Sequence, residues 1–319
     1  MPDQDNAVAL LQQHVATEVG KAVVGQPELL SQCTVALLCR GHVLLEGVPG
    51  LAKTLVVKVL ARLLQLDYQR VQATPDLMPA DILGGNVANL ANGTFSLRRG
   101  PIFTDLLLVD EINRMPPRTQ AALLEAMEER QVTIEGELHT LRDDFLVFAT
   151  QNPVEFEGTY PLPEAQLDRF LLKIRVGYPE RAAEEAMLAQ YQHGENAHDL
   201  GRLGLVTLAP ALLAAARRQV NAVRVEPQLV SYVAAVVRRT REWPILMLGA
   251  SPRAALSLLH AAKAMAACEG RDYLLPDDVK AAALPVLRHR LVLKPEADLE
   301  GVSADQAITE VLAAVEVPR

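Results

Sequence analysis

The chain has 319 residues, 50% of them hydrophobic but only 4% aromatic, and a formal net charge of −8. This length allows two domains and a substantial core, while the negative balance argues against a globally basic surface for nucleic acid. Its three cysteines form no C-x-x-C pair, no apolar run approaches membrane-spanning length, and the N-terminus lacks the basic region of a signal peptide, so we expect a cytoplasmic protein without direct membrane insertion.

Two helices are predicted before the first strand. One begins after Asn6, and a second runs from Pro27, a residue suited to a first helical turn, to Leu38. An apolar run, Val43 to Leu45, then predicts a strand, and a helical pattern follows from about Thr54 to Leu64.

The turn between this strand and helix is typical of a loop that holds a nucleotide's phosphates. Its amides point inward, the helix N-terminus adds partial positive charge, Lys53 reaches the outer phosphates and Thr54 holds Mg²⁺. Ala52 replaces the second glycine of the usual pattern, and the loop can keep its shape if this position needs the right-handed helical region, which alanine tolerates well. A plain turn before a helix is the alternative. The loop consists of Gly47, Val48, Pro49, Gly50, Leu51, Ala52, Lys53 and Thr54.

A strand at 67–71 and an irregular stretch at 74–83 are predicted next. Residues 86–103 indicate a hairpin-bearing insertion, because Asn92-Gly93 is a turn signal between apolar flanks. Arg98 and Arg99 follow, and such a pair is more typical of a solvated face than of a functional contact.

The apolar run Leu106 to Val109 ends in Asp110-Glu111. A run that is apolar throughout predicts a strand buried on both faces of a parallel sheet, and ligands bind at the carboxyl ends of such strands. We expect Asp110 to hold Mg²⁺ and Glu111 to polarise the attacking water. Two surface carboxylates are the alternative, which their position downstream of a phosphate loop disfavours.

A helix from Pro117 to about Arg130 and a hairpin at 131–141 are predicted before the next buried strand, Phe145 to Thr150. That strand ends in Gln151-Asn152-Pro153. Asn152 could orient the water or sense the γ-phosphate, although an asparagine before proline is by itself more often a turn former.

Strands alternating with helices predict a doubly wound α/β sheet domain over residues 1–200, with a last strand at 171–176 and a helix opened by Pro179. The polar stretch Gly194 to Gly204 is the predicted boundary. Beyond it the pattern is helical only, which predicts a smaller all-α domain over 207–319. Its helices are expected at about 208–223, 227–242, 251–267, 276–290 and 303–316.

The motifs in this order resemble the MoxR family of AAA+ ATPases, in which alanine at the position of Ala52 is usual. The similarity runs from about Val24 to Arg253. It is carried by the residue stretches 47–54, 106–114, 149–153, 100–103, 163–170 and 249–254.

The resemblance implies roles beyond the phosphate loop. Arg169 matches the arginine finger that reaches a neighbouring subunit's γ-phosphate, Asn152 matches sensor 1 and Arg253 matches sensor 2. From the residues alone, Arg169 would pair with Asp168 or Glu164. Residues 86–103 match the helix-2 insertion of this clade, and 131–143 match the hairpin before sensor 1. In proteins with that insertion the C-terminal helical domain, called the lid, is typically displaced. This leaves open whether Arg253 acts in its own subunit or across an interface.

Two further sets of residues are candidates for the site or its surroundings. Val24 and Gly25, with the valine before them, match the segment near adenine. Arg114 and Arg118 follow the acidic strand end and are weaker candidates for a subunit interface.

The function implied is ATP hydrolysis with Mg²⁺ by a ring, typically hexameric, that remodels or matures protein clients together with a von Willebrand factor A domain partner. A magnesium-chelatase-like metal-insertion subunit and a DNA-directed motor are the alternatives, with nucleic acid disfavoured by the charge. A scaffold that binds nucleotide without turnover is disfavoured because all the candidate residues for turnover are present: Lys53, Asp110, Glu111, Asn152, Arg169 and Arg253.

Overall fold

A five-stranded parallel sheet, covered by helices on both faces, is the base from which the rest of the protein extends. The structure is a computed structural model and describes residues 6–89, 94–154, 158–192 and 199–318. The predicted parallel α/β sheet is confirmed, and each strand starts or ends within a residue or two of its expected bounds. Across the sheet the strands lie in the order β2 (Tyr68–Gln72), β5 (Leu106–Asp110), β8 (Leu146–Gln151), β1 (Val43–Glu46) and β9 (Leu172–Arg175).

Successive residues of the central strands serve two separate cores. Leu44 and Leu107 belong to the cluster on one face of the sheet, whereas Val43, Leu45 and Leu106 belong to the cluster on the other. Side chains alternate across a strand, so a run without polar residues is what a sheet covered on both faces requires.

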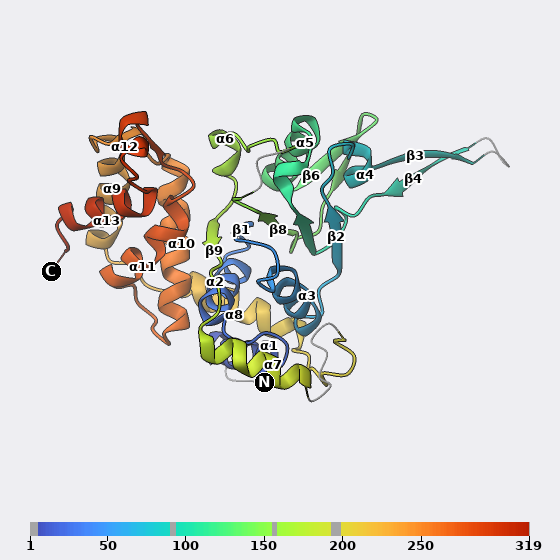
Figure 1. Cartoon of the computed structure of the whole chain (residues 1–319), viewed down its shortest axis with the longest axis horizontal. Coiled ribbons are helices and arrows are strands. Elements are labelled where there is room, and N and C mark those ends of the chain that lie inside the picture. Colours follow the sequence, from blue (N-terminus) through green and yellow to red (C-terminus); the bar gives the residue numbers. More distant parts are fainter. Residues whose placement is uncertain (1–5, 90–93, 155–157, 193–198, 319) are drawn as a thin grey trace.

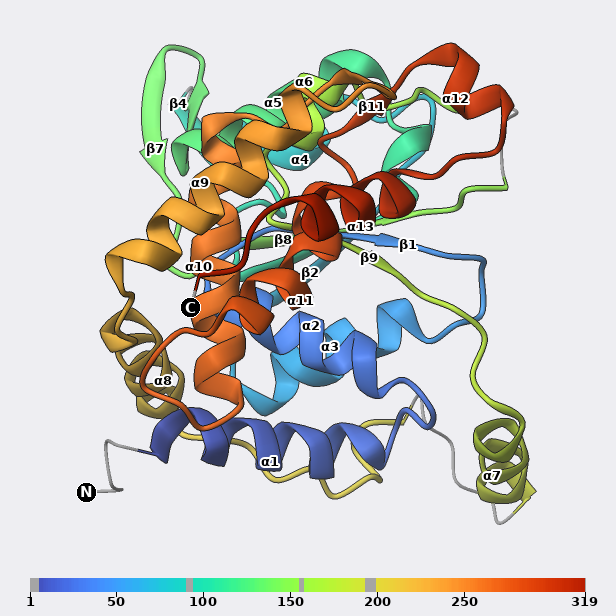
Figure 2. The same ribbon diagram turned by 90° about the vertical axis from the view of Figure 1, so that its left-hand side faces the viewer.

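Helices cover both faces of the sheet. In Figure 2, α1 (Ala7–Gly20), α2 (Pro27–Leu38) and α3 (Lys53–Leu63) lie below the sheet, and α4 (Pro79–Leu83) and α5 (Pro117–Glu129) lie above it. The stretch that contains α4 was expected to be irregular. The helix forms because proline suits its first position and Asp81 Oδ2 accepts a hydrogen bond from the Met78 amide (2.8 Å).

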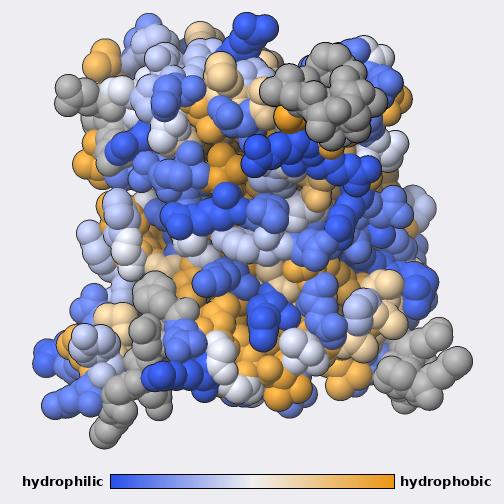
Figure 3. All heavy atoms as spheres, turned by 90° about the vertical axis from the view of Figure 1, so that its right-hand side faces the viewer, coloured by the Kyte–Doolittle hydropathy of each residue, from blue (hydrophilic) through white to orange (hydrophobic). Residues whose placement is uncertain are grey.

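Two hairpins extend from the base. The first pairs β3 (Gly84–Asn89) with β4 (Thr94–Arg99) and projects away from the sheet (Figure 1), while the predicted turn at Asn92-Gly93 lies outside the described residues. The face on that side of the molecule carries hydrophilic and apolar residues interspersed (Figure 3). The second pairs β6 (Gln131–Ile134) with β7 (Glu137–Thr140) through Glu135 and Gly136. Both have positive φ, as the favoured two-residue hairpin turn requires.

The C-terminal part is helical, as predicted. It contains one short antiparallel pair besides, β10 (Leu246–Leu248) with β11 (Val292–Leu293), which is too short to leave a period in the sequence. The boundary near residue 200 stays a prediction, because part of it lies outside the described residues and because α8 lies beside α1 (Figure 1). The helices from α7 onward are α7 (Arg181–Gln192), α8 (Pro210–Ala222), α9 (Pro227–Arg241), α10 (Pro252–Cys268), α11 (Pro276–Leu287), α12 (Pro295–Leu299) and α13 (Ala304–Ala314). No helix within the described ranges has the length and apolar character of a membrane span.

Candidate functional site

The sheet order brings the polar motifs together. Strands β5, β8 and β1 are neighbours, so Asp110, Asn152 and the loop after Glu46 meet at one carboxyl edge of the sheet. A cavity of about 610 Å³ opens there. Its lining includes Pro49, Gly50, Leu51, Ala52, Lys53, Thr54, Asp110, Glu111, Asn152 and Val24.

Gly47 and Val48, the first two residues of the loop, do not line the cavity, but their carbonyl oxygens bind the side chain of Lys53. Lys53 Nζ donates to the carbonyl oxygen of Val48 (2.9 Å) and to that of Gly47. Burial lowers the pKa of Lys53, and the nearby carboxylates of Asp110 and Glu111 oppose that shift. The loop carbonyls thus keep the ammonium group at the rim of the cavity, where a phosphate chain would meet it.

The backbone of Ala52 differs from the expectation. Its φ of 56° and ψ of 14° place it in the left-handed region, not in the right-handed helical one. An L-residue there costs roughly 1–2 kcal/mol, so the loop stores strain that glycine would avoid. Alanine is nevertheless accommodated, because Ala52 precedes α3 and packs against the core beneath the loop.

Asp110 is a buried carboxylate, 6% exposed, with several donors around it. The hydroxyls of Thr54 and Thr150 each lie 3.2 Å from Oδ1, and Arg70 Nε donates to Oδ2 at 2.7 Å. Arg70 supplies the positive charge that a buried carboxylate needs. Mg²⁺ is commonly held by one or two carboxylates together with substrate phosphates, so the oxygens of Thr54 and Asp110 fit this ion.

Glu111 is held beside Asp110 in a left-handed conformation, with φ of 58°. Its amide donates to Thr150 Oγ1 (2.9 Å) and its Oε2 accepts from Gln72 Nε2 (3.1 Å), while Oε2 also forms an ion pair with Arg114, 3.0 Å from Nε. Arg114, expected as an interface candidate, is therefore a direct neighbour of Glu111. Arg118 is exposed and does not line the cavity.

Asn152 is buried, and its Oδ1 accepts a hydrogen bond from the Val154 amide (3.2 Å). This bond turns the carbonyl side of the amide toward its own chain, so its –NH₂ group is the part available to an anion.

Helix α7 forms an apolar wall of the cavity that sequence reasoning missed. Met187, Leu188 and Tyr191 line the cavity from this helix, yet they are 53%, 63% and 79% exposed. Gly25 does not line the cavity. It lets α7 approach, because a Cβ there would lie 2.3 Å from the Cβ of Ala183. In the sequence, the apolar residues near the end of α7 were the signal that could have pointed to this wall.

The two remaining predicted arginines lie elsewhere. Neither Arg169 nor Arg253 lines the cavity beside the loop 47–54, which we call the phosphate cavity. Both line a second cavity of about 260 Å³. Arg169 Nε donates to Glu128 Oε2 (2.8 Å), and Arg253 Nη2 donates to Oε1 of the same carboxylate. These bonds, that to Arg253 foremost, lower the pKa of Glu128. Glu128, not Asp168 or Glu164, is the partner of Arg169.

The second cavity is rich in positive charge. Against the carboxylates of Glu128 and Asp168 it presents five guanidinium groups, which suits an anion brought from outside the chain. The five belong to Arg40, Arg130, Arg169, Arg253 and Arg290.

Comparisons with known proteins agree with this geometry. Residues 42–172 match the ATPase family associated with various cellular activities (AAA), and residues 238–311 match the AAA lid domain. The chain is 45% identical over 300 residues to the uncharacterized protein YeaC of Bacillus subtilis, covering 94% of this chain and 92% of the relative. It is 42% identical to chaperone MoxR1 of Mycobacterium tuberculosis, covering 95% and 81%. A solved candidate ATPase of Cytophaga hutchinsonii aligns with a TM-score of 0.88 at 40% identity over 98% of both chains.

Proposed function

The chain belongs to the MoxR family of AAA+ ATPases, and from this premise we propose that it hydrolyses ATP at sites shared between the subunits of a ring. The observation that carries the proposal is the separation of the two cavities. The residues fit for phosphates and Mg²⁺ line one cavity, whereas Arg169 and Arg253 line the other. A neighbouring chain would join them.

Each residue of the phosphate cavity has a part in this proposal. Lys53 and the loop amides bind the phosphates, and Thr54 with Asp110 holds Mg²⁺, which neutralises charge on the phosphates when bound. Glu111 takes the role of orienting and polarising the attacking water. Asn152, whose amide nitrogen is available, contacts the γ-phosphate or that water.

The neighbour's arginines complete the site. A single arginine finger is worth on the order of 10³–10⁵ in rate, so hydrolysis depends on assembly. Since Arg169 and Arg253 share Glu128, we propose that both act across the interface on one nucleotide. Closure of the lid against the sheet domain would transmit the work to a client.

The wider role rests on the family. We propose chaperone-like remodelling or maturation of protein clients by a hexameric cytoplasmic ring with a von Willebrand factor A domain partner. The formal charge of −8 disfavours a nucleic-acid client.

The test is the ATPase rate per subunit as a function of protein concentration, for wild type beside Arg169→Ala, with the mass of the assembly measured in parallel. We expect the wild-type rate to rise as rings form. Assembled Arg169→Ala should lose at least about a thousandfold in rate.

The shared site would be contradicted if the ATPase rate per subunit did not depend on protein concentration and Arg169→Ala did not change it, in a protein without pre-formed oligomers. The protein would then act as a monomeric switch.

A further inference from the structure

Arg290 lies just beyond the end of α11, where its side chain is only 2% exposed. Its Nε donates to Asp168 Oδ1 at 2.6 Å. Asp168 directly precedes Arg169. A fully buried arginine from the C-terminal helices thus binds the residue next to the proposed finger.

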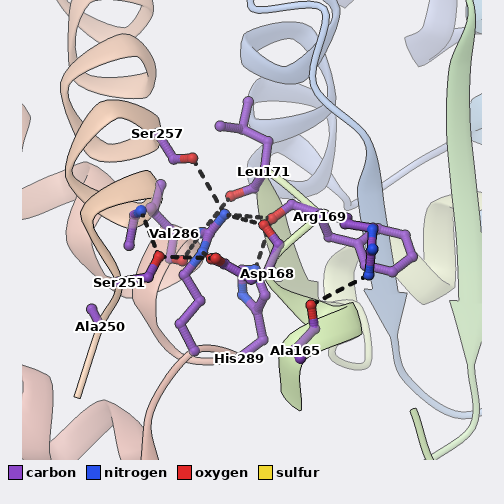
Figure 4. Close-up of polar contacts among 12 residues, drawn as sticks. Ala165, Asp168, Arg169, Leu171, Ala250, Ser251, Ser257, Val286 and His289 are labelled. Atoms are coloured by element: carbon purple, nitrogen blue, oxygen red, sulfur yellow. Dashed lines mark hydrogen bonds and ion pairs between the residues drawn. The ribbon is translucent and has the colours of Figure 1, made fainter. Parts of the chain in front are cut away.

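Three further hydrogen bonds of Arg290 reach the same turn, while two others hold it within the C-terminal helices, to the Val286 carbonyl and to Ser257 Oγ. Nη2 donates to the carbonyl oxygens of Asp168 (3.2 Å) and Phe170 (2.7 Å), and Nη1 donates to that of Leu171 (3.2 Å). Figure 4 shows these bonds converging on the segment between α6 (Glu164–Leu167) and β9, while the side chain of Arg169 points away. The contacts therefore fix the backbone on both sides of Arg169 without engaging its guanidinium, which bonds Glu128 and the carbonyl oxygen of Ala165 instead.

The other oxygen of Asp168 is bound to the helix that carries the second arginine. Ser251 Oγ donates to Asp168 Oδ2 (2.9 Å) and accepts from the Ala254 amide (3.2 Å), so Ser251 caps the N-terminus of α10. Arg253 lies in the first turn of that helix. The carboxylate of Asp168 thus joins the turn at 168–171 that carries Arg169 (the finger turn) to the cap of α10 and to the end of α11.

We propose that Arg290 is a positioning residue for the arginine finger: from the lid, it clamps the Asp168–Leu171 turn so that Arg169 and Arg253 are presented together to the neighbouring subunit's nucleotide. Movement of the lid in one subunit then changes the finger that it offers to the next. This inference rests on the proposed shared site.

The chemistry of the clamp fits positioning better than stability alone. A buried ion pair contributes little net stability, because desolvation offsets its attraction, and apolar residues could fill the same space. A guanidinium offers five donors in a rigid plane, and here all three of its nitrogens are used. Lysine would keep the charge but lacks the fixed fork of donors that reaches the Asp168 carboxylate and the carbonyls of the turn together.

The test uses mixed rings of two variants that are each inactive alone. Glu111→Gln subunits cannot hydrolyse ATP but donate a finger, and Arg169→Ala subunits have an intact phosphate cavity but donate none. Their mixture should recover ATPase activity. Arg290→Lys is then placed either on the donor or on the receiver, and ring mass is measured in each mixture.

We expect Arg290→Lys on the donor to lower the recovered rate about 10- to 100-fold, the cost of a small misplacement at a reacting centre. The same change on the receiver should leave the rate within about twofold, since its finger is already absent. The matched control is Arg288→Lys, which removes a largely buried arginine two residues away. Arg288 bonds Asp305 (3.1 Å) and the carbonyl of Lys173 (3.3 Å) but not the finger turn, so it should behave alike on either side.

Equal losses in both arrangements would assign Arg290 a structural role and overturn the proposal, as would no loss in either. Failure of the parental mixture to recover activity would instead refute the shared site, and with it any such role for Arg290.

Discussion

At the scale of single residues, Glu111 is the group on which turnover depends in the proposed mechanism. Its carboxylate is anchored by Gln72 and Arg114, so Glu111→Gln keeps the shape and much of the hydrogen bonding but loses the charge that polarises water. We predict that Glu111→Gln binds ATP with wild-type affinity and loses at least about a hundredfold in hydrolysis rate. Nucleotide titration and a phosphate-release assay on the same preparation check this.

Lys58→Gln, which changes an exposed residue of α3 that does not line the cavity, serves as the control and should hydrolyse ATP normally. Turnover at the wild-type rate by Glu111→Gln would remove Glu111 from the mechanism.

How much of the site could be predicted depends on how local each residue's placement is. Lys53, Thr54, Asp110 and Glu111 follow strand ends, so spacing in the sequence is enough to bring them together. Arg70 and Glu128 reach the site only through the order of strands and the packing of α5, for which a single sequence holds no local signal. The left-handed backbone of Ala52 was missed for a related reason: alanine's propensity describes isolated helices, and the loop's closure overrides it.

At the scale of elements, α7 is the least anchored helix near the site. None of its side chains is buried, yet Met187, Leu188 and Tyr191 line the phosphate cavity. Exposed apolar groups facing a partly apolar cavity near Val24 suit the flat face of a base.

We therefore predict that Tyr191→Ala weakens ATP binding about tenfold, because loss of an aromatic contact to a base typically costs about 1–3 kcal/mol. The affinity is measured by calorimetry in the Glu111→Gln background, where ATP is not consumed. Tyr178→Ala is the matched control, since Tyr178 is 76% exposed just before α7 but does not line the cavity. Equal affinities for the two variants would exclude α7 from the base site.

Elements were predictable in proportion to their length. The long helices and the buried strands carry several turns or a full apolar run, and their bounds agree with the expectation. Helix α4, with five residues, and the pair β10–β11, with three and two, are shorter than the period that reveals them, and tertiary contacts decide their form.

At the scale of the whole molecule, two buried histidines connect separate layers. His42 accepts from the Val147 amide of β8 (3.0 Å) and donates to the Met127 carbonyl of α5 (3.1 Å), while His289 donates to the Phe170 carbonyl (2.9 Å). Burial lowers the pKa of His42 to about 4 and that of His289 well below its usual value. Both are therefore neutral in the folded protein at neutral pH.

This predicts a loss of stability in mild acid. Below pH 6.5 the unfolded chain binds a proton at His42 that the folded chain does not, so stability is complete above that pH and falls as the pH drops toward about 4. His42 alone should cost about 2 kcal/mol at pH 5. Urea unfolding at pH 7.5 and 5.0, for wild type beside His42→Gln, measures it. A variant that loses as much stability as wild type between the two pH values would show that His42 is not responsible.

The carboxylate that Arg169 and Arg253 share has a consequence for how two chains meet. Two arginines share one carboxylate before an encounter, so Glu128 balances only one of their two positive charges. In the proposed ring, a neighbour's nucleotide competes with Glu128 for both guanidinium groups. Closure of that ring is therefore expected to weaken as ionic strength rises, but less steeply than an association in which both arginines start without a carboxylate partner.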